Sequence, residues 1–369
     1  MKKPLSNKKM LVIGPLPPPI SGVSLANRIV CEYLPLKYKE LRVSFINNSF
    51  PTFKEDLGSF SWKKVLFYLK QYKLLKVLRN DILYLTPGQT FFGVIKYFPF
   101  IGLAALLKKH IIIHIHGNYV HQEFVRLDAL RKRLYHYILS RATKGIVLSP
   151  TLKKNLSPFI AEDSIYILFN FVEDYLLDID IKNKIRTNFS SLKILYLSNL
   201  MEEKGIFDFF EALQILKNNK IPFSATIAGG IDPKLQAQIS KKFDELNNFI
   251  SYRGIVSGEE KKEILVNANI FVFPTYYRME GQPIVLLEAM ATGNIILTTE
   301  HAGIPDIFKE NKNGFFIKKR SPVDIAEKLS RLSSHLSIYK NIAMNNHIEA
   351  TRKYTVDQFI SNLHEIIES

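Results

Sequence analysis

Short apolar stretches alternate with longer amphipathic stretches along most of this 369-residue chain. A first series comprises residues 10–15, 41–47, 81–86, 111–116, 145–149 and 165–170, and a second comprises residues 193–199, 223–230, 249–254, 270–275 and 295–299. Continuous apolar strands separated by helix-length segments are typical of parallel sheets that helices cover on both faces. The pattern therefore predicts an α/β protein built from parallel sheets.

The two series are separated by a stretch that begins at Asn170 and is first acidic and then polar, as linkers between domains often are. We therefore expect two doubly wound, Rossmann-like domains facing across a cleft, residues 1–171 and residues 172–350, followed by a terminal segment, residues 351–369. Ligands bind such sheets at the carboxyl ends of the strands. The loops that follow the strands are thus where we expect functional residues.

Composition narrows the class of protein. The chain is 47% hydrophobic with a mean hydropathy of zero, which suits a globular protein. Its one cysteine, Cys31, excludes a disulfide framework and indicates a reducing compartment. The apolar stretch near the N-terminus is cut by Gly14 and four prolines, and residues 91–109 are broken by Lys96 and Pro99. We therefore expect neither a signal peptide nor a membrane-spanning segment.

Charge is distributed unevenly along the chain. Residues 1–170 contain 26 Lys and Arg against 9 Asp and Glu, whereas residues 171–369 contain 24 against 25. All the excess positive charge therefore lies in the first half. This asymmetry indicates that the first domain faces an anionic partner while the second does different work.

The most basic stretch, residues 62–79, has no acidic residue, and residues 130–144 have a similar character. As a helix, residues 62–79 would place apolar side chains on one side and lysines, among them Lys70, Lys73 and Lys76, on its flanks. This pattern fits an interfacial helix on an anionic membrane, but it also fits a core-facing helix with a solvated basic side. Nucleic acid is not an expected partner, because the sequence has no zinc-knuckle, helix-turn-helix or RNP-type motif.

Two loops of the first half carry candidate site residues. Gly22 precedes a predicted helix, so it either admits a phosphate to the helix N-terminus or only permits a tight turn. His116 is the last side chain of its strand before Gly117 and shares one side of the strand with His114. It could contact substrate, bind a metal or be satisfied inside the fold.

Two loops of the second half are more informative. Lys204 and Gly205 lie between a strand and a helix, where a lysine either binds phosphate or is only solvated. The stretch EGQPIVLLEAM places Glu280 before a helix predicted for residues 284–291 and Glu288 inside it. These carboxylates can accept hydrogen bonds from sugar or ribose hydroxyls while the helix N-terminus holds a diphosphate. They could instead form the acid and base of a glycoside hydrolase, which would not need phosphate-binding loops.

The segment EGQPIVLLEAMATGNIILTTEHAGIPDIF resembles the E-x7-E motif of family 4 glycosyltransferases, the retaining enzymes of GT-B fold. Further segments agree with that family in order along the chain: GPLPPPISGVS, HIHG, ILFNFVED, LSNLMEEKG, IAGG and YRGIVSGEEKKEILVNANIFVFPTYY. The resemblance thus covers essentially the whole length. It implies that residues 351–369 cross back to the first domain.

The resemblance also implies roles for individual residues. The catalytic residues would be His116, beside the donor sugar and acceptor, Glu280, on the donor sugar hydroxyls, and Lys204, on the diphosphate. Glu288 would bind the ribose, and Gly22 would give the phosphates room. The donor-binding set is completed by Asn199 and by the backbone of Gln282, Pro283, Ile284 and Val285. No metal ligand and no cofactor are implied, and a UDP-sugar is favoured over a GDP-sugar as the donor substrate.

The sequence departs from the family at three positions. Asn199 stands where many relatives carry an arginine that binds phosphate, so Arg278 or Arg253 is a candidate to replace that cation. Ser21 precedes Gly22 where many relatives have a second glycine, and Asp306 stands where relatives usually carry glutamate. These departures concern donor binding and the handling of the leaving group.

The resemblance and the charge together predict a function. We expect a metal-independent, retaining transfer of a hexose or N-acetylhexosamine to a lipid-linked saccharide, in the biosynthesis of an O-antigen, capsule or exopolysaccharide. The enzyme would be cytoplasmic and peripheral on the inner face of the cytoplasmic membrane, with its basic first domain on anionic lipid. A non-catalytic GT-B partner protein and a GT-B nucleotide-sugar epimerase are the alternatives.

Overall fold

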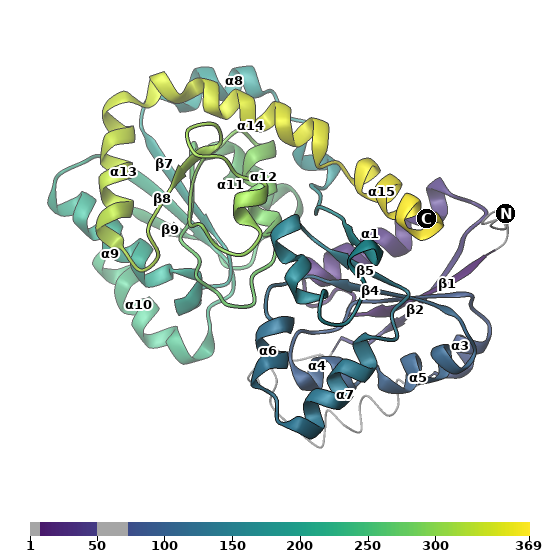
Figure 1. The fold of residues 1–369 in the computed structure, drawn as a ribbon. Coiled ribbons are helices and arrows are strands. Elements are labelled where there is room, and N and C mark those ends of the chain that lie inside the picture. Colours follow the sequence, from purple (N-terminus) through teal and green to yellow (C-terminus); the bar gives the residue numbers. More distant parts are fainter. Residues whose placement is uncertain (1–7, 50–72) are drawn as a thin grey trace. The chain divides into compact units, whose positions relative to one another are not determined.

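The computed structural model describes residues 8–49 and 73–369, and the chain divides into two compact units. The first unit consists of Met1–Asn170, Met279–Gln282 and Asp357–Ser369, and the second consists of Phe171–Arg278 and Pro283–Val356. Each unit contains one six-stranded sheet (Figure 1), and every strand pair is parallel. The α/β fold with parallel sheets predicted from the sequence is therefore confirmed.

The first sheet has the strand order β2-β1-β3-β4-β5-β6. Its strands are β1 (Lys9–Gly14), β2 (Arg42–Asn47), β3 (Ile82–Leu85), β4 (His110–Ile115), β5 (Lys144–Val147) and β6 (Ile165–Ile167). The helices of this unit are α1 (Gly22–Lys37), α3 (Leu75–Leu78), α4 (Phe91–Ile95), α5 (Phe98–Leu106), α6 (Val120–Arg126) and α7 (Ala129–Leu139). Each of the strands coincides with an apolar stretch identified in the sequence.

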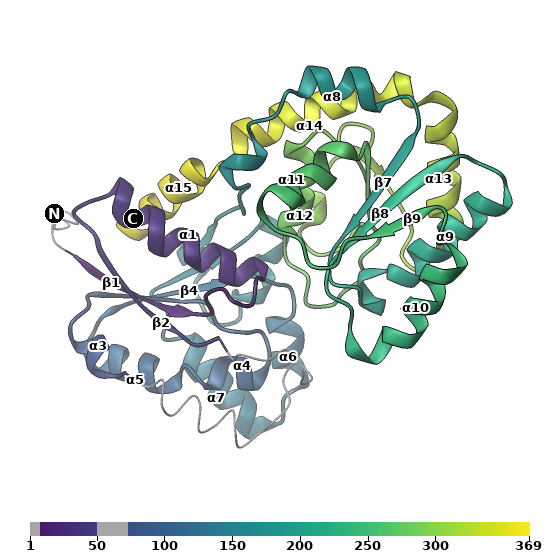
Figure 2. The same cartoon turned by 180° about the vertical axis from the view of Figure 1, so that it is seen from behind.

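The two faces of the first sheet differ in what covers them. Alternate residues of β4, Ile111, Ile113 and Ile115, belong to the apolar core shared with α4, α5 and α7 (Figure 1). Helix α1 lies on the opposite face (Figure 2). His114 alternates with these isoleucines, as the sequence predicted, and is completely buried.

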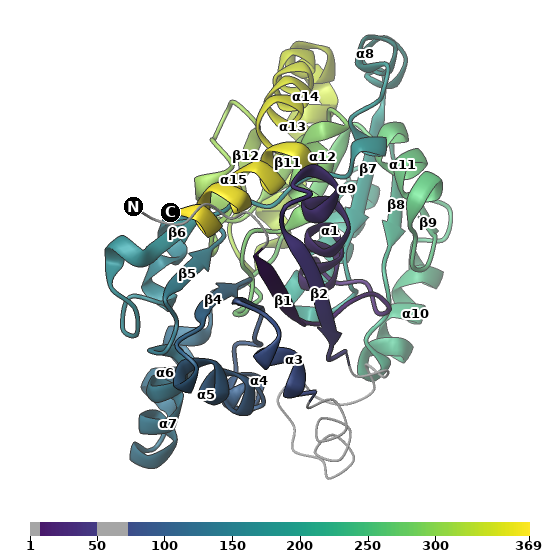
Figure 3. The same cartoon turned by 90° about the vertical axis from the view of Figure 1, so that its right-hand side faces the viewer.

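The final helix, α15 (Val356–Glu368), packs against the first unit. Lys37 at the end of α1 forms an ion pair with Asp357, and the rings of Tyr38 and His364 stack with their centroids 3.5 Å apart. Lys144 of β5, which lies near α15 in Figure 3, donates a hydrogen bond of 2.5 Å to the carbonyl oxygen of Ile366. A cation at a helix C-terminus satisfies carbonyl groups that have no partner within the helix.

The second sheet has the strand order β12-β11-β10-β7-β8-β9. Its strands are β7 (Leu192–Leu197), β8 (Phe223–Ala228), β9 (Ile250–Tyr252), β10 (Ile270–Phe273), β11 (Ile295–Thr298) and β12 (Gly314–Phe316). The helices are α8 (Ile181–Asn188), α9 (Ile206–Asn218), α10 (Gln236–Glu245), α11 (Gly258–Asn267), α12 (Ile284–Ala291), α13 (Pro322–His335) and α14 (Lys340–Lys353). Helix α9 packs against α13, and α12 packs against α14. Strand β12 was not predicted.

The basic stretch 62–79 lies mostly outside the described residues. Only its end is described, and this part contains the short helix α3. There, Lys76 donates a hydrogen bond of 2.9 Å to the carbonyl oxygen of Phe45. Lys70 is not described, so the interfacial helix stays a prediction.

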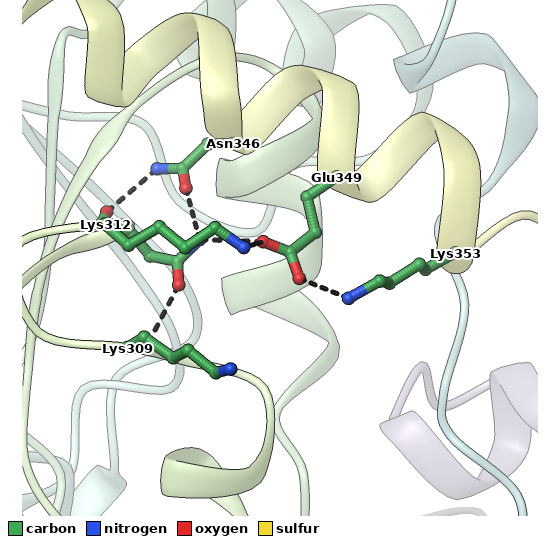
Figure 4. A network of polar contacts seen from close by, with 6 residues as sticks. Lys309, Lys312, Asn346, Glu349 and Lys353 are labelled. Carbon is green, nitrogen blue, oxygen red and sulfur yellow. Dashed lines mark hydrogen bonds and ion pairs between the residues drawn. The ribbon is translucent and has the colours of Figure 1, made fainter.

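A polar network attaches α14 to the loop before β12 (Figure 4). The amide of Asn346 donates to the carbonyl oxygens of Asn294 and Asn313, at 2.7 and 2.8 Å. Glu349 accepts hydrogen bonds from Lys312 and Lys353, at 2.8 and 2.7 Å. Burial by itself would raise the pKa of Glu349, but these two lysines and Asn313 outweigh it and lower the pKa to about 2.

Glu349→Gln is expected to destabilise the protein at neutral pH and to have little effect at low pH. A carboxylate whose pKa is lowered on folding stabilises the protein above the pKa of the unfolded chain, and this contribution is lost as pH falls towards 2. We expect a loss of stability of about 2 kcal/mol at pH 7, a figure reduced for solvent screening because both lysines are partly exposed. Near pH 2 the loss should be small, because the carboxylate then becomes protonated. Urea unfolding at several pH values measures this. Glu327→Gln, at an exposed position of α13, is the control, and equal effects of the two variants would contradict the prediction.

Candidate functional site

His116 and the segment of Glu280 lie together within the first unit. His116 follows β4, and a Cβ atom added at Gly281 would lie 2.6 Å from its carbonyl oxygen and 3.1 Å from the Cα of Gly117. Only glycine permits so close an approach of two backbones. Glu280 itself is 8% exposed. The structure therefore brings together the backbone segments that carry His116 and Glu280, two of the three residues predicted to be catalytic.

His114 in β4 and His116 just after it lie side by side; His114 is buried and His116 is partly buried. Their ring centroids are 3.9 Å apart, and the hydroxyl of Tyr84 lies 2.5 Å from Nδ1 of His114. Burial lowers the pKa of His116 to about 3, and burial together with His116 lowers the pKa of His114. His116 is therefore neutral near pH 7. Among the residues that the structure describes, its Nε2 has no hydrogen-bond partner.

His116→Gln is expected to make stability less sensitive to acid. Between pH 6.5 and about 3 the unfolded chain binds a proton at His116 that the folded chain does not, so stability falls as pH falls through this window. Removing the imidazole should lessen the loss between pH 7 and pH 5 by about 2 kcal/mol. Urea unfolding at both pH values measures it. His136→Gln, at an exposed position of α7, is the control, and an unchanged slope in His116→Gln would contradict the assignment.

Gly22 is the first residue of α1. Ser21 and Ser24 form a capping box at the start of this helix. The hydroxyl of Ser21 accepts a hydrogen bond of 3.1 Å from the backbone N–H of Ser24, and the hydroxyl of Ser24 accepts one of 2.8 Å from the backbone N–H of Ser21. The box leaves the N–H groups of Gly22 and Val23 at the open helix end. Since Gly22 is already part of a right-handed helix, a turn conformation does not require glycine here.

Two residues that sequence reasoning missed, Gln89 and Asn170, attach the segment Met279–Gln282 to the rest of the first unit by hydrogen bonds. Gln89 accepts a hydrogen bond from the backbone N–H of Tyr119 at 2.6 Å and donates one to the carbonyl oxygen of Met279 at 3.0 Å. Asn170 donates to the side-chain and backbone oxygens of Gln282, at 2.6 and 2.7 Å. The side chain of Gln282 is thus engaged in the fold, which leaves only its backbone for the phosphate role predicted from the sequence.

Lys204 ends a short 3-10 helix, Glu202–Lys204, after β7 in the second unit. Its Nζ lies 5.2 Å from the ring centroid of Phe273 and 5.0 Å from that of Tyr277, distances typical of cation–π contacts. Gly205 has a φ of +77°, and a Cβ there would lie 2.4 Å from the carbonyl oxygen of Pro274. The glycine therefore allows the loop of Lys204 to pack on the loop after β10.

Asn199 is exposed in the same loop. Of the two cations considered as replacements for the missing arginine, Arg278 is exposed and Arg253 lies 3.4 Å from Glu260. A third cation, Arg320, stacks on Tyr276 at 4.6 Å from the ring centroid. Tyr276 is next in the chain to Tyr277, whose ring contacts Lys204. Arg320 is therefore a candidate cation that sequence reasoning overlooked.

Helix α12 carries the second glutamate of the motif. Pro283 is its N-cap, so the helix starts at Ile284 as predicted, and no side chain caps the N–H groups of Ile284 and Val285. Glu288 is 2% exposed, and its Oε1 lies 2.6 Å from Nζ of Lys261 in α11. The sequence did not predict this ion pair.

The predicted site residues thus form two groups. Gly22, His116, Glu280 and Gln282 belong to the first unit, and Asn199, Lys204, Pro283, Ile284, Val285 and Glu288 belong to the second. Among residues 8–49 and 73–369, no group of three or more His, Cys, Asp or Glu side chains could hold a metal ion. In the same residues, no helix has the length and apolar character needed to span a membrane.

Comparison with solved structures identifies the fold. The crystal structure of Anabaena Alr3699/HepE in complex with UDP matches 97% of this chain and 99% of that chain with a TM-score of 0.73 at 14% identity. Two parallel-sheet units of this kind are those of GT-B glycosyltransferases, so the GT-B fold predicted from the sequence is confirmed. Residues 178–349 match the family model described as Glycosyl transferases group 1.

Curated relatives match part of the chain. The amylovoran biosynthesis glycosyltransferase AmsK of Erwinia amylovora is 34% identical over 146 residues, which cover 38% of this chain and 36% of AmsK. The N,N'-diacetylbacillosaminyl-diphospho-undecaprenol alpha-1,3-N-acetylgalactosaminyltransferase of Campylobacter jejuni is 28% identical over 153 residues, 41% of this chain and 38% of that protein. The matches therefore span little more than a third of each relative.

Proposed function

We propose that this protein is a retaining, metal-independent glycosyltransferase of family 4. It transfers a hexose or N-acetylhexosamine from a nucleoside-diphosphate sugar to a saccharide acceptor in the biosynthesis of a cell-surface polysaccharide such as an O-antigen, capsule or lipopolysaccharide. The observation that carries the proposal is the E-x7-E segment: Glu280 is buried, the next residue, Gly281, lies against the backbone of His116, and Glu288 lies in a helix with an open N-terminus. The family match over residues 178–349 supports it.

The proposed residues divide the chemistry between them. The donor diphosphate lies at the N-terminus of α12, where Lys204 and the N–H groups of Ile284 and Val285 stabilise the charge that develops as the sugar–phosphate bond breaks. Glu280 accepts hydrogen bonds from the donor sugar. The acceptor hydroxyl attacks the face that the diphosphate leaves, and its proton passes to the departing phosphate. His116, neutral at pH 7, orients the reacting sugar by hydrogen bonding.

The donor and acceptor classes follow from this proposal and from the relatives. A UDP-sugar is favoured, in line with the UDP bound by the Anabaena protein. The acceptor is a lipid-linked saccharide, and the name of the Campylobacter relative, which includes a diphospho-undecaprenol acceptor, supports that choice. Such an acceptor places the enzyme at the cytoplasmic face of a membrane.

One surface of the first unit suits an anionic membrane. Helix α7 lines a hollow of about 520 Å³ together with Phe124 of α6, and its lining includes Lys132 and Arg133. Leu130, close to these cations on α7, is 77% exposed. Cations beside exposed apolar side chains are what an interfacial surface requires.

Lys132→Glu combined with Arg133→Glu is expected to release the protein from anionic vesicles. Each cation near the surface contributes about 1 kcal/mol, so two reversals should lower partitioning by at least about tenfold. Co-sedimentation with vesicles containing phosphatidylglycerol measures it, and phosphatidylcholine vesicles should bind little of either form. Lys241→Glu combined with Lys328→Glu in the second unit is the control. Unchanged sedimentation of the α7 variant would remove this surface from the proposal.

A nucleotide screen tests the donor site. The purified protein is heated with UDP, GDP or ADP and with their common sugars, each in the presence and absence of EDTA. One nucleoside diphosphate should raise the melting temperature whether or not EDTA is present, since a ligand at about 100 times its Kd adds about 2.7 kcal/mol. A response to none of them would favour a non-catalytic GT-B partner protein, and a response that EDTA abolishes would contradict metal independence.

A product assay tests the reaction. The nucleotide sugar found by the screen is incubated with a lipid-linked acceptor, and the anomeric configuration of the product is read by NMR. Transfer with the donor's own configuration is expected. Inverted product would contradict the retaining mechanism, and conversion of the donor to a sugar epimer without acceptor would favour the epimerase alternative.

A further inference from the structure

Glu288 is embedded in an apolar helix that offers it no polar partner of its own. Helix α12 has the sequence IVLLEAMA, and all of its residues except Val285 are buried. A carboxylate in such surroundings is costly unless a cation or hydrogen-bond donors compensate it. The compensating group comes from another helix, since Lys261 of α11 extends its ammonium to Oε1 at 2.6 Å.

Lys261 is itself held by two further groups. Its Nζ lies 3.8 Å from a carboxylate oxygen of Glu173, and it donates a hydrogen bond to the hydroxyl of Tyr175. Both residues come from the segment that opens the second unit and includes the 3-10 helix Asp174–Leu176. Burial lowers the pKa of Lys261, but the attraction of Glu288 and Tyr175 outweighs it and raises the pKa above its usual value. The lysine is therefore a fixed cation with a 14% exposed side chain.

The second oxygen of the carboxylate remains available. Within the described part of the chain, Oε2 of Glu288 has no ion pair or hydrogen bond, whereas Oε1 is held by Lys261. Fixing one oxygen restricts rotation of the side chain, so the other is directed before any ligand arrives. Such preorganisation increases affinity because less side-chain freedom is lost on binding.

We propose that Lys261 is a positioning residue that orients the Glu288 carboxylate to accept a hydrogen bond from a ribose hydroxyl of the donor nucleotide. The inference rests on the proposed function, which places the ribose at Glu288, and it adds the residue that makes this contact selective. Glu173 and Tyr175 support Lys261 from the other side.

The test compares the binding of UDP and 3′-deoxy-UDP, and of GDP and 3′-deoxy-GDP, by titration calorimetry. Wild type should bind one ribonucleotide more tightly than its deoxy analogue. Lys261→Met should weaken ribonucleotide binding by about tenfold or more, with a smaller effect on the analogue, so that the preference approaches one. Lys261→Arg keeps the charge and should restore part of the preference. Lys262→Met, on the next residue of α11, is the matched control and should keep all of it.

A second variant, Tyr175→Phe, keeps the test valid if Lys261→Met does not fold. Tyr175→Phe leaves the ion pair in place and removes only one support of Lys261, so it should fold and lower the ribose preference partially. If Lys261→Met, or Tyr175→Phe where the first does not fold, keeps the full preference, the positioning role is wrong while the proposed function stands. If wild type binds none of these nucleotides, the proposed function fails and this inference fails with it.

Discussion

Glu288→Gln is expected to remove transfer activity and to destabilise the second unit, and adding Lys261→Met is expected to restore the stability without the activity. The single change leaves the buried Lys261 without its main partner, which should cost about 2 to 3 kcal/mol because Glu173 and Tyr175 still face the lysine. The double change removes both charges of the Lys261–Glu288 ion pair. Neither variant keeps the carboxylate for the ribose, so kcat/KM should fall about 10²-fold or more in both.

Urea unfolding and steady-state kinetics on the same preparations measure the two effects separately. Glu327→Gln in α13 is the control for stability and activity alike. A double variant that regained transfer would show that Glu288 is a structural residue only. A single variant as stable as wild type would show instead that the ion pair contributes little.

Lys204→Ala is expected to lower kcat by about 10² to 10³, with a smaller change in KM. The ammonium stabilises charge that increases as the diphosphate leaves, so its removal affects the transition state more than the bound donor. Stability should change little, because Gly205 and not the lysine side chain sets the path of this loop.

Kinetics with a saturating donor measure the effect of Lys204. Lys204→Arg should retain part of kcat, and Lys241→Ala, at an exposed position of α10, should retain all of it. If Lys204→Ala kept kcat within about threefold, the charge would have to come from another cation. Arg320, stacked on Tyr276, would then be the first residue to replace.

The sequence predicted the strands well because parallel strands buried on both faces are continuous apolar runs. Strand β12 was missed because its sequence, GFF, begins with a glycine and follows the polar residues ENKN. The helix at Ile284–Ala291 was predicted from Pro283, expected as its first residue, and from Gly293 after it. Pro283 is instead the N-cap, and Gly293 has a φ of +66°. Residues that start or end a helix act locally, so they can be recognised in a single sequence.

The contacts that support the site were less predictable. Gln89 and Asn170 act through partners about 110 to 190 positions away in the chain, a separation at which a single sequence carries no pairing signal. Lys261 lies in a run of charged residues, GEEKKE, that looks like an exposed helix face. Only the fold shows that one lysine of this run is directed inward.

The assignment of Met279–Gln282 to the first unit has a practical consequence for recombining such proteins. A chimaera made by exchanging residues up to Asn170 would leave behind four residues that contact the exchanged unit, and the amide contacts of Gln282 would be made by a foreign partner. The first unit is therefore discontinuous in the gene. Its replacement has to carry three pieces: the first 170 residues, the four around Glu280 and the last thirteen.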